Sequence, residues 1–317
     1  MTTLSSPPGF RGGFRTDGDA CAVYSEAAGI ERRMPRAIAV PVDADDLAVL
    51  LGWAHRNQMP LIPRGSGSSM ASGAIGDGVI VDVSRWRAIH PIDMQRKTIC
   101  VEPGVLRGEV EAAARAHGLR FPVDPSSGAF CTIGGMAATN AAGSHSMHFG
   151  SMRPWVNSLT CMFAGGTRAE VRRGAPAPRA VPAIDRFLSI AHELIAEDHL
   201  GVIKNSSGYA VSEYRQSGDL VDLLVGSEGT LAFFVSVELS LATAPAATSS
   251  VLGTFTSLEQ AVQAAMHARE SGAVACELLD RTFLDVAAAG GATRLVPANT
   301  DSFMERSFAR VSRLQSC

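Results

Sequence analysis

The chain has 317 residues, of which 46% are hydrophobic and 19% are charged, and its formal net charge at pH 7 is -3. This length is enough for one large or two medium domains with a buried core. Binding to a nucleic-acid backbone needs clustered Lys and Arg, so the charge balance argues against nucleic acid as the main partner. The most apolar stretch, 231–247, is interrupted by Glu238 and hydroxyl residues, so we predict a buried strand there and no transmembrane segment.

Cysteines and histidines limit the function further. The six cysteines form no C-x-x-C pair, and residues 1–14 lack the apolar region of a secretion signal. We therefore predict reduced, mostly buried thiols in a cytoplasmic protein. The pairs His145 with His148 and His192 with His199 lack a third carboxylate or cysteine at a suitable spacing, so no metal site is predicted.

The first part of the chain predicts a βαβ unit. Residues 1–31 are polar and Gly-rich without periodicity, so we expect a surface arm and a first strand at 37–40. Asp43 then caps a helix that ends by Asn57, and a strand follows at 61–62. The apolar face of this helix consists of Leu47, Leu50, Leu51 and Ala54. The connecting loops of such units are common cofactor sites.

Further strands and helices follow along the chain. We predict strands at 78–83, 98–101, 158–163 and 231–241, helices at 105–117 (ended by Gly118) and 184–197, and a loop at 172–182. Residues 242–250 are rich in Ala, Pro, Thr and Ser and predict a linker. A new unit then begins, with a strand at 251–255, a helix opened by the capping box Ser257-x-x-Gln260 with Val262, Ala265 and Met266 on one face, and a strand at 274–279.

Glycine- and serine-rich loops are the most informative feature of the chain. The first reads Pro63-Arg64-Gly65-Ser66-Gly67-Ser68-Ser69, and the second combines Asp124-Pro125-Ser126-Ser127 with Thr132-Ile133-Gly134-Gly135. A third tight segment is Gly226-Ser227-Glu228-Gly229-Thr230. Consecutive amides with little side-chain bulk form concavities that bind anions. One such loop alone is typical of a surface turn, but three together predict a large phosphate-bearing cofactor.

Other nucleotide-binding and hydrolytic motifs do not fit. Gly65-x-Gly67 with Asp82 would suggest a nicotinamide site, but Met70 replaces the third glycine of that motif. Residues 68–78 carry too many glycines for the helix that the motif requires. The sequence contains no Gly-Lys-[Ser/Thr] phosphate loop and no G-x-S-x-G nucleophile elbow.

Residues from about 32 to 241 resemble the FAD-binding domain of the vanillyl-alcohol oxidase / p-cresol methylhydroxylase family. Within it they are most similar to FAD-linked 2-hydroxy-acid dehydrogenases, namely the glycolate oxidase FAD subunit, D-lactate dehydrogenase and D-2-hydroxyglutarate dehydrogenase. The first two loops resemble the pyrophosphate loops of the family, the second running on to Asn140 and Gly143. The family also has a third motif, which lies near the adenosine and the flavin. In this chain it is resembled by two segments, Lys204-Asn205-Ser206-Ser207-Gly208-Tyr209 and Gly226-Ser227-Glu228-Gly229-Thr230-Leu231.

The resemblance implies an α/β (α+β) fold. A two-lobed FAD-binding domain of the p-cresol methylhydroxylase type would occupy 32–244, after an N-terminal arm at 1–31 and before the start of an α+β cap domain at 245–317. FAD would lie between the lobes, bound non-covalently, because Ser66 and Ser68 flank Gly67 where some relatives carry an attachment histidine. The implied cofactor-binding residues are Arg64, Gly65, Ser66, Gly67, Ser68, Ser69, Pro122, Asp124, Pro125, Ser126, Thr132, Ile133, Gly134, Gly135, Asn140, Gly143, Glu228 and Leu231. Ala232-Phe233-Phe234 departs from the small Gly-Ile-type residues usual in the family.

The implied reaction is hydride transfer from the α-carbon of a D-2-hydroxy acid (lactate, glycolate or 2-hydroxyglutarate type) to flavin, with electrons passed on to a quinone, cytochrome or iron–sulfur partner. In the family the catalytic groups come mainly from the cap domain and C-terminal segment, of which only 251–284 is recognisable, so the catalytic residues stay unknown. Two alternatives remain open: a truncated FAD-binding fragment or subunit without catalysis of its own, and an oxidase of alcohols or sugars. We expect the isolated chain to bind FAD but to reduce it slowly, unless residues such as Lys204 or Tyr209 complete the site.

Overall fold

The structure, a computed structural model, describes residues 4–179, 206–289 and 307–315. The predicted helix at 184–197, the His192–His199 pair and Lys204 lie outside the described residues. Contacts divide the chain into two compact units. The larger unit comprises Met1–Phe121, Ser127–Ala141 and Met152–Ala242, and the smaller unit comprises Pro122–Ser126, Ala142–Ser151 and Thr243–Cys317. In the described ranges, no helix combines the length and hydropathy needed to cross a membrane.

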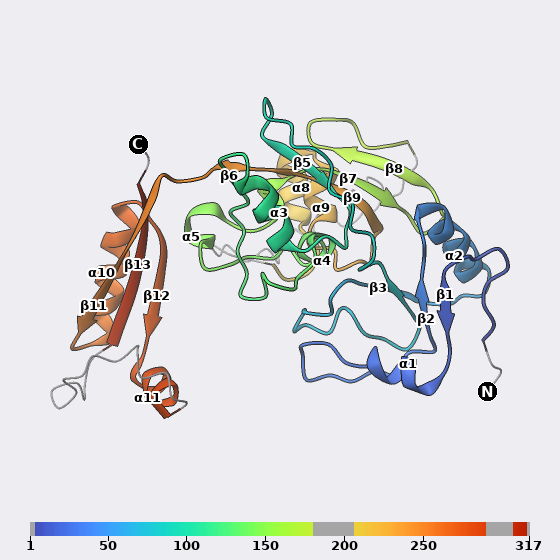
Figure 1. Cartoon of the computed structure of the whole chain (residues 1–317), viewed down its shortest axis with the longest axis horizontal. Coiled ribbons are helices and arrows are strands. Elements are labelled where there is room, and N and C mark those ends of the chain that lie inside the picture. The colour runs from blue at the N-terminus through green and yellow to red at the C-terminus, as the bar shows by residue number, and fades with distance from the viewer. Residues whose placement is uncertain (1–3, 180–205, 290–306, 316–317) are drawn as a thin grey trace. The chain divides into compact units, whose positions relative to one another are not determined.

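The first sheet of the larger unit contains the predicted βαβ arrangement (Figure 1). Its strand order is β1 (Gly13–Arg15), β2 (Ala37–Val40), β4 (Val79–Asp82) and β3 (Leu61–Arg64). Strands β2 and β3 both run parallel to β4 and flank it, and α2 (Ala44–Arg56) connects them. The side chain of Asp43 caps α2 by accepting a hydrogen bond from the Asp46 amide at 2.9 Å. The predicted apolar face of α2 is buried, which confirms the helix and its orientation.

The N-terminal residues are more ordered than the sequence indicates. We expected no regular structure before 37, but β1 pairs with β2 and is followed by α1 (Gly18–Val23). The carboxylate of Asp46, which is fully buried, accepts hydrogen bonds from the amides of Arg11 at 2.7 Å and Gly12 at 2.9 Å. A buried carboxylate needs such donors, so this contact fixes the N-terminal residues against α2.

The second sheet of the larger unit is antiparallel. Its strand order is β5 (Thr98–Val101), β9 (Phe233–Ser240), β7 (Val156–Met162) and β8 (Arg168–Arg172), of which only β8 was not predicted. The two sheets share one hydrophobic cluster, in which Trp53 of α2 packs with Met162 of β7 and Phe233 of β9. The remaining elements are α3 (Arg107–Arg115), β6 (Leu119–Arg120), α4 (Ile133–Ala138), η1 (Arg153–Trp155), α8 (Val211–Ser217), α9 (Leu220–Leu224) and β10 (Ala242–Thr243).

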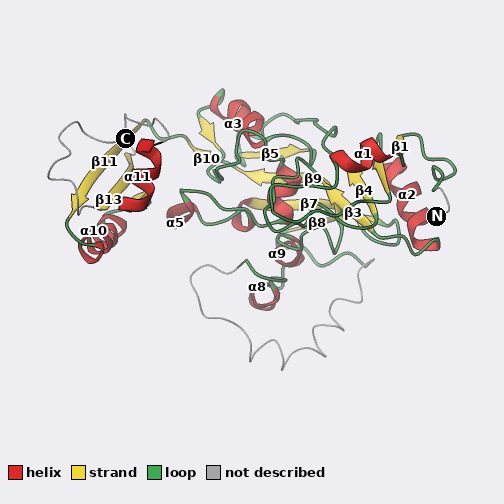
Figure 2. Cartoon of the chain, turned by 90° about the horizontal axis from the view of Figure 1, so that it is seen from below, coloured by secondary structure: helices red, strands yellow, loops and turns green. Residues whose placement is uncertain are grey.

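The smaller unit contains an antiparallel sheet with the order β11 (Ala247–Phe255), β13 (Ser307–Gln315) and β12 (Ala273–Leu279). Helix α10 (Leu258–Glu270) packs against these strands, as Figure 2 shows, and α11 (Arg281–Ala289) follows β12 in the chain. The unit also includes α5 (Ser146–Phe149). The linker predicted at 242–250 is wrong in its second half, because β11 begins at Ala247. Ser257 caps α10 as predicted, accepting from the Gln260 amide at 3.3 Å.

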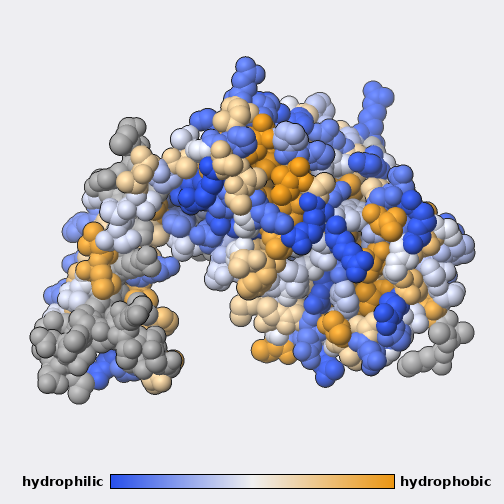
Figure 3. Space-filling model, viewed as in Figure 1, coloured by the Kyte–Doolittle hydropathy of each residue, from blue (hydrophilic) through white to orange (hydrophobic). Residues whose placement is uncertain are grey.

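The predicted apolar face of α10 does not pack into a core. Val262 is 46% exposed and Met266 is 58% exposed, whereas the neighbouring Ala261 is fully buried. Large apolar residues of β11 and α11 are exposed as well, namely Val251, Leu252, Phe283 and Val286. Figure 3 shows hydrophobic residues at the surface of this unit. Helix α10 therefore buries its small residues against the sheet and leaves its larger ones at the surface.

Candidate cofactor site

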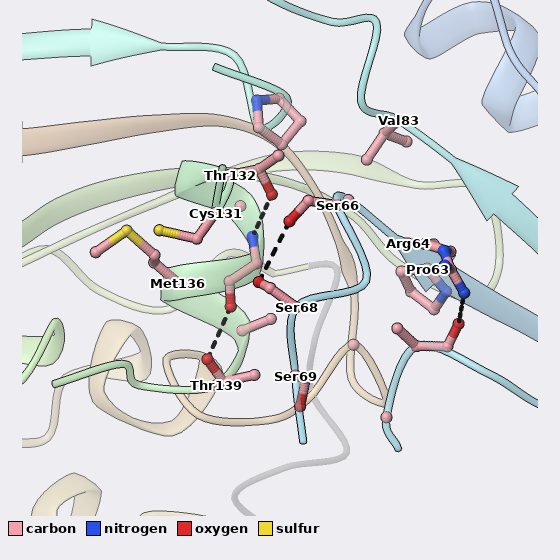
Figure 4. Close-up of a pocket in the computed structure, with 18 of the residues that line it drawn as sticks. Pro63, Arg64, Ser66, Ser68, Ser69, Val83, Cys131, Thr132, Met136 and Thr139 are labelled. Carbon is pink, nitrogen blue, oxygen red and sulfur yellow. Dashed lines mark hydrogen bonds between the residues drawn. The ribbon is translucent and has the colours of Figure 1, made fainter. Parts of the chain in front are cut away.

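One hollow in the larger unit is lined by all three glycine-rich segments (Figure 4). Counted with the solvent at its mouth, it measures about 970 Å³. The first loop contributes residues 63–69, the second contributes residues of 131–139, and the third contributes Glu228 and Gly229. Val83, Pro103, Phe233 and Phe234 add an apolar wall. Segments that are separated by up to 166 positions (63 to 229) thus meet at one site.

The first loop presents free backbone donors. It continues directly from β3, and Gly67 has a φ of +70°, a conformation that glycine adopts without strain. Within the described part of the chain, the amides of Ser66–Ser69 donate no hydrogen bond to another protein group. The hydroxyls of Ser66 and Ser68 lie 3.3 Å apart beside Thr132. Consecutive amides without partners, next to small polar side chains, suit an anionic group such as a phosphate.

The second loop forms the start of α4, where Thr132 is the N-cap residue. Its Oγ1 accepts a hydrogen bond from the Gly135 amide at 3.3 Å, and the Gly134 amide donates to the Pro103 carbonyl at 2.8 Å. We expected these two amides to face a phosphate, but both already have acceptors within the protein. A Cβ placed on Gly134 would lie 2.5 Å from Cβ of Pro103, so this glycine permits close packing of α4.

The third segment docks on the end of α4 and on the first loop. The amides of Gly226 and Glu228 donate to the carbonyls of Ala137 at 3.0 Å and Ala138 at 2.8 Å. Gly229 has a φ of +76°, and a Cβ placed there would lie 2.7 Å from Cγ of Pro63. Tyr209, from the first half of the third motif, shares a hydrogen bond of 2.7 Å with Thr230. The third segment is therefore held by backbone contacts on two sides.

Some predicted cofactor residues of the larger unit lie outside the hollow. Ile133, the first residue of α4, is fully buried, and Leu231 lines a separate open hollow with residues of α2. Asn140 has a φ of +47°, and its Oδ1 accepts the Arg153 amide at 2.9 Å. Burial lowers the pKa of Arg153, whose guanidinium also donates to the Val225 carbonyl at 2.9 Å. Arg153 thus connects Asn140, at the end of α4, to the segment before the third loop.

The other predicted residues fall in the smaller unit, where they form a group of their own. This unit contains Pro122, Asp124, Pro125, Ser126 and Gly143. A Cβ placed on Gly143 would overlap the carbonyl of Asp124, which explains why glycine stands there. Because the hollow belongs to the larger unit, a cofactor role for these residues stays a prediction.

Several lining residues were not predicted from the sequence. Met136 and Thr139 face the hollow from α4 and its C-terminal end, and Thr139 Oγ1 donates to the Gly135 carbonyl at 3.0 Å. Cys131, which we expected to be a buried thiol next to the second loop, is buried and also lines the hollow beside Met136. A helical spacing of four from Thr132 to Met136 could have indicated a shared face, but only after the helix at 133–138 had been recognised.

The residues present fit a dinucleotide cofactor with a pyrophosphate. The amides of Ser66–Ser69 provide donors, and residues 65–69 carry only serine hydroxymethyl groups or, at the glycines, a hydrogen atom. Val83, Met136 and Phe234 supply apolar surface on which a planar ring system could pack. Glu228, whose backbone is held at a φ of +53°, is the acidic residue among those that line this hollow.

Comparison with known proteins identifies the cofactor class. Residues 35–172 match the protein family described as FAD binding domain. A D-2-hydroxyglutarate dehydrogenase of Pseudomonas putida is 30% identical over 256 residues, which cover 75% of this chain and 25% of that protein. A probable mitochondrial D-lactate dehydrogenase of Danio rerio is 28% identical, covering 76% of this chain and 42% of that protein. A glycolate oxidase subunit of Bacillus subtilis is 27% identical, covering 76% of this chain and 44% of that protein.

Among solved structures, an alkyldihydroxyacetonephosphate synthase superposes with a TM-score of 0.70 at 20% identity, over 96% of this chain and 53% of that one. This likeness confirms the predicted fold. The matched part of this chain covers from 25% to 44% of the length of the three curated relatives named above. Residues 35–172 thus match an FAD-binding domain, and FAD is the cofactor, as the resemblance of the glycine loops implied.

Proposed function

We propose that this protein is an FAD-dependent oxidoreductase that oxidises a D-2-hydroxy acid of the lactate, glycolate or 2-hydroxyglutarate type to the 2-oxo acid. The observation that carries the proposal is the meeting of three glycine segments at one hollow, in a chain similar to dehydrogenases of such acids. Bound FAD supplies a two-electron acceptor for the hydride of the substrate α-carbon. The chain itself binds, orients and shields this cofactor.

The described residues support two separate roles within the site, one for backbone amides and one for apolar side chains. The amides of Ser66–Ser69, which donate to no other described residue, are the groups that we propose for the pyrophosphate. Phe233 and Phe234 are mostly buried on β9 and contribute apolar surface to the hollow. A water-poor apolar wall strengthens electrostatic interactions at the reacting atoms and protects the reduced cofactor from side reactions.

The binding mode, the location and the electron acceptor are finer parts of the same proposal. Ser66, Gly67 and Ser68 offer no side chain of the type that attaches a flavin, so we propose non-covalent binding. The free thiols of the described cysteines Cys21, Cys100, Cys131, Cys161 and Cys276 support a reducing compartment such as the cytoplasm. Electrons would leave through a quinone, cytochrome or iron–sulfur partner.

Anaerobic stopped-flow bleaching of the flavin tests the reaction. D-lactate and D-2-hydroxyglutarate should bleach the flavin faster than their L enantiomers at equal concentration, and glycolate should be compared with ethylene glycol. Equal rates for both enantiomers, with rapid bleaching by dithionite, would contradict a D-2-hydroxy-acid dehydrogenase. Faster bleaching by a simple alcohol or sugar would favour an oxidase of those compounds.

A second candidate is an FAD-binding subunit whose catalysis depends on another polypeptide. The observation that favours it is the exposed apolar set on α10, β11 and α11, since exposed clusters of this kind mark interaction surfaces. This candidate predicts a protein that is yellow and releases FAD on acid treatment, yet is bleached equally slowly by every acid. The enantiomer comparison therefore separates the two candidates.

A further inference from the structure

The segment Tyr24–Gly29 lies against the first glycine loop although it precedes the family-matched region 35–172. The Ala28 amide donates a hydrogen bond to the Gly67 carbonyl at 3.0 Å. A Cβ placed on Gly29 would lie 2.5 Å from the Met70 carbonyl oxygen, so the two backbones touch here. The segment thus contacts the loop at two points on either side of Ser68 and Ser69.

Arg64 provides a third contact at the beginning of the same loop. Its Nη1 donates to the carbonyls of Glu26 at 2.8 Å, Tyr24 at 3.3 Å and Ala74 at 3.3 Å. Its guanidinium carbon lies 5.1 Å from the centre of the Tyr24 ring, within the range of a cation–π interaction. Burial lowers the pKa of Arg64, because removal from water disfavours the charged guanidinium. Arg64 therefore ties Tyr24–Gly29 to the loop that follows it.

Tyr24 is itself anchored in the first sheet. Its hydroxyl donates to Oδ2 of Asp82, which is mostly buried at the end of β4, and Oδ1 of Asp82 accepts the Ser84 amide at 2.8 Å. Asp82 and Arg64 occupy paired positions of the parallel strands β4 and β3. The ring of Tyr24 is consequently fixed near the C-terminal end of β3, where the first loop begins.

We propose that Tyr24–Gly29 is a positioning element that holds the first loop with the amides of Ser66–Ser69 open to the cofactor's phosphates. A loop of Gly and Ser has many alternative conformations, and ordering it only on binding would reduce affinity. The contacts from Ala28, Gly29 and Tyr24 fix that loop before the cofactor arrives. The inference concerns FAD binding and does not depend on which substrate is oxidised.

Glycine substitutions within the N-terminal region provide a matched test. Gly29→Ala places a methyl group against the Met70 carbonyl, whereas Gly18→Ala places one where no atom lies within 4 Å. Flavin fluorescence titration of the apoprotein should show FAD affinity reduced by about tenfold or more in Gly29→Ala and unchanged in Gly18→Ala. The melting temperature of the apoprotein, measured in parallel, reports the effect on folding alone.

Substitutions of Tyr24 give a second, independent measurement. Tyr24→Phe keeps the ring beneath Arg64 and loses the bond to Asp82, whereas Tyr24→Leu loses both. Affinity for FAD should fall in the order wild type, Phe, Leu, and the visible circular dichroism of bound flavin should change in the same order. Equal affinities for Gly29→Ala and Gly18→Ala, or for Tyr24→Leu and wild type, would overturn the proposal. A wild-type protein that takes up no FAD would overturn the cofactor assignment and this proposal together, whereas failure of hydroxy-acid oxidation would leave it intact.

Discussion

Gly65 of the first loop packs directly on Thr132 of the second. A Cβ placed on Gly65 would overlap Oγ1 of Thr132 and lie 3.2 Å from its Cβ. That same hydroxyl accepts the Gly135 amide and so caps α4. The contact therefore couples the first loop to the helix cap on which the second loop depends.

Substituting Gly65 with Ala should separate the two loops. The added methyl group cannot fit without moving the α4 cap, and overpacking of this kind typically costs about 1–3 kcal/mol. We expect a clear loss of FAD affinity by fluorescence titration together with a lower melting temperature. Gly165→Ala is the control, since nothing lies within 4 Å of a Cβ at that turn. Indistinguishable FAD content in the two variants would show that the loops do not act together.

Gly134 and Gly135 should respond differently to the same substitution. A methyl group on Gly134 would strike Pro103, so Gly134→Ala should destabilise the protein whether or not FAD is bound. A methyl group on Gly135 would meet the Thr132 hydroxyl at 3.1 Å, a milder approach within the cap. Gly135→Ala should therefore reduce FAD affinity, while lowering the melting temperature of the apoprotein less than Gly134→Ala does. Differential scanning calorimetry of both apoproteins provides the measurement, and identical melting curves would contradict this division.

The elements that the sequence predicted well are those specified by neighbouring residues. The cap at Asp43 and the spacing of Leu47, Leu50 and Leu51 determine α2 locally. The three glycine-rich segments likewise indicated the residues that line the hollow. In contrast, Asp46 binds the amides of Arg11 and Gly12 across 34–35 positions, so the order of the N-terminal residues could not be read from local composition.

The limits of sequence reasoning at the site have the same cause. The glycine pattern indicated where small residues are needed but not which atom each of them makes room for. Gly134 makes room for Pro103, a residue about thirty positions earlier, and Gly143 makes room for the carbonyl of Asp124. Strand β11 begins among polar residues at Ala247 because it pairs with β13, which lies some sixty residues later.

The exposed apolar residues of α10 should drive self-association of the purified protein. Met266→Gln replaces a largely exposed side chain, and surface substitutions of this kind usually change stability by less than about 0.5 kcal/mol. Light scattering should show less concentration-dependent association in Met266→Gln, with an unchanged melting temperature. His267→Gln, one position further along the same helix, is the control. Association that is the same in all three proteins would show that this face of α10 is not the cause.

Glu238 connects three strands of the second sheet through one buried carboxylate. It lies on β9, where Oε2 accepts hydrogen bonds from Arg172 of β8 at 2.7 Å and Ser158 of β7 at 3.1 Å. Its Oε1 lies 2.8 Å from Arg96. Burial alone would raise the pKa of Glu238, but the hydrogen bonds from Arg172 and Ser158 and the nearby positive charges outweigh it and lower that pKa.

The lowered pKa of Glu238 makes the contribution of this carboxylate to the free energy of unfolding depend on pH. In the unfolded chain the carboxyl binds its proton at a higher pH than in the folded protein, so stability falls as the pH drops from about 4.5 through the folded pKa. Glu238→Gln should lower the free energy of unfolding at pH 7 by about 1–3 kcal/mol, because charged hydrogen bonds are lost. The difference from wild type should narrow below about pH 4.5, where the wild type loses the same contribution. Urea unfolding between pH 3 and 8 provides the measurement, with Glu170→Gln as the control, since this exposed carboxylate pairs with the same Arg172. A difference between Glu238→Gln and wild type that stays constant across this range would show that the charge of Glu238 does not stabilise the sheet.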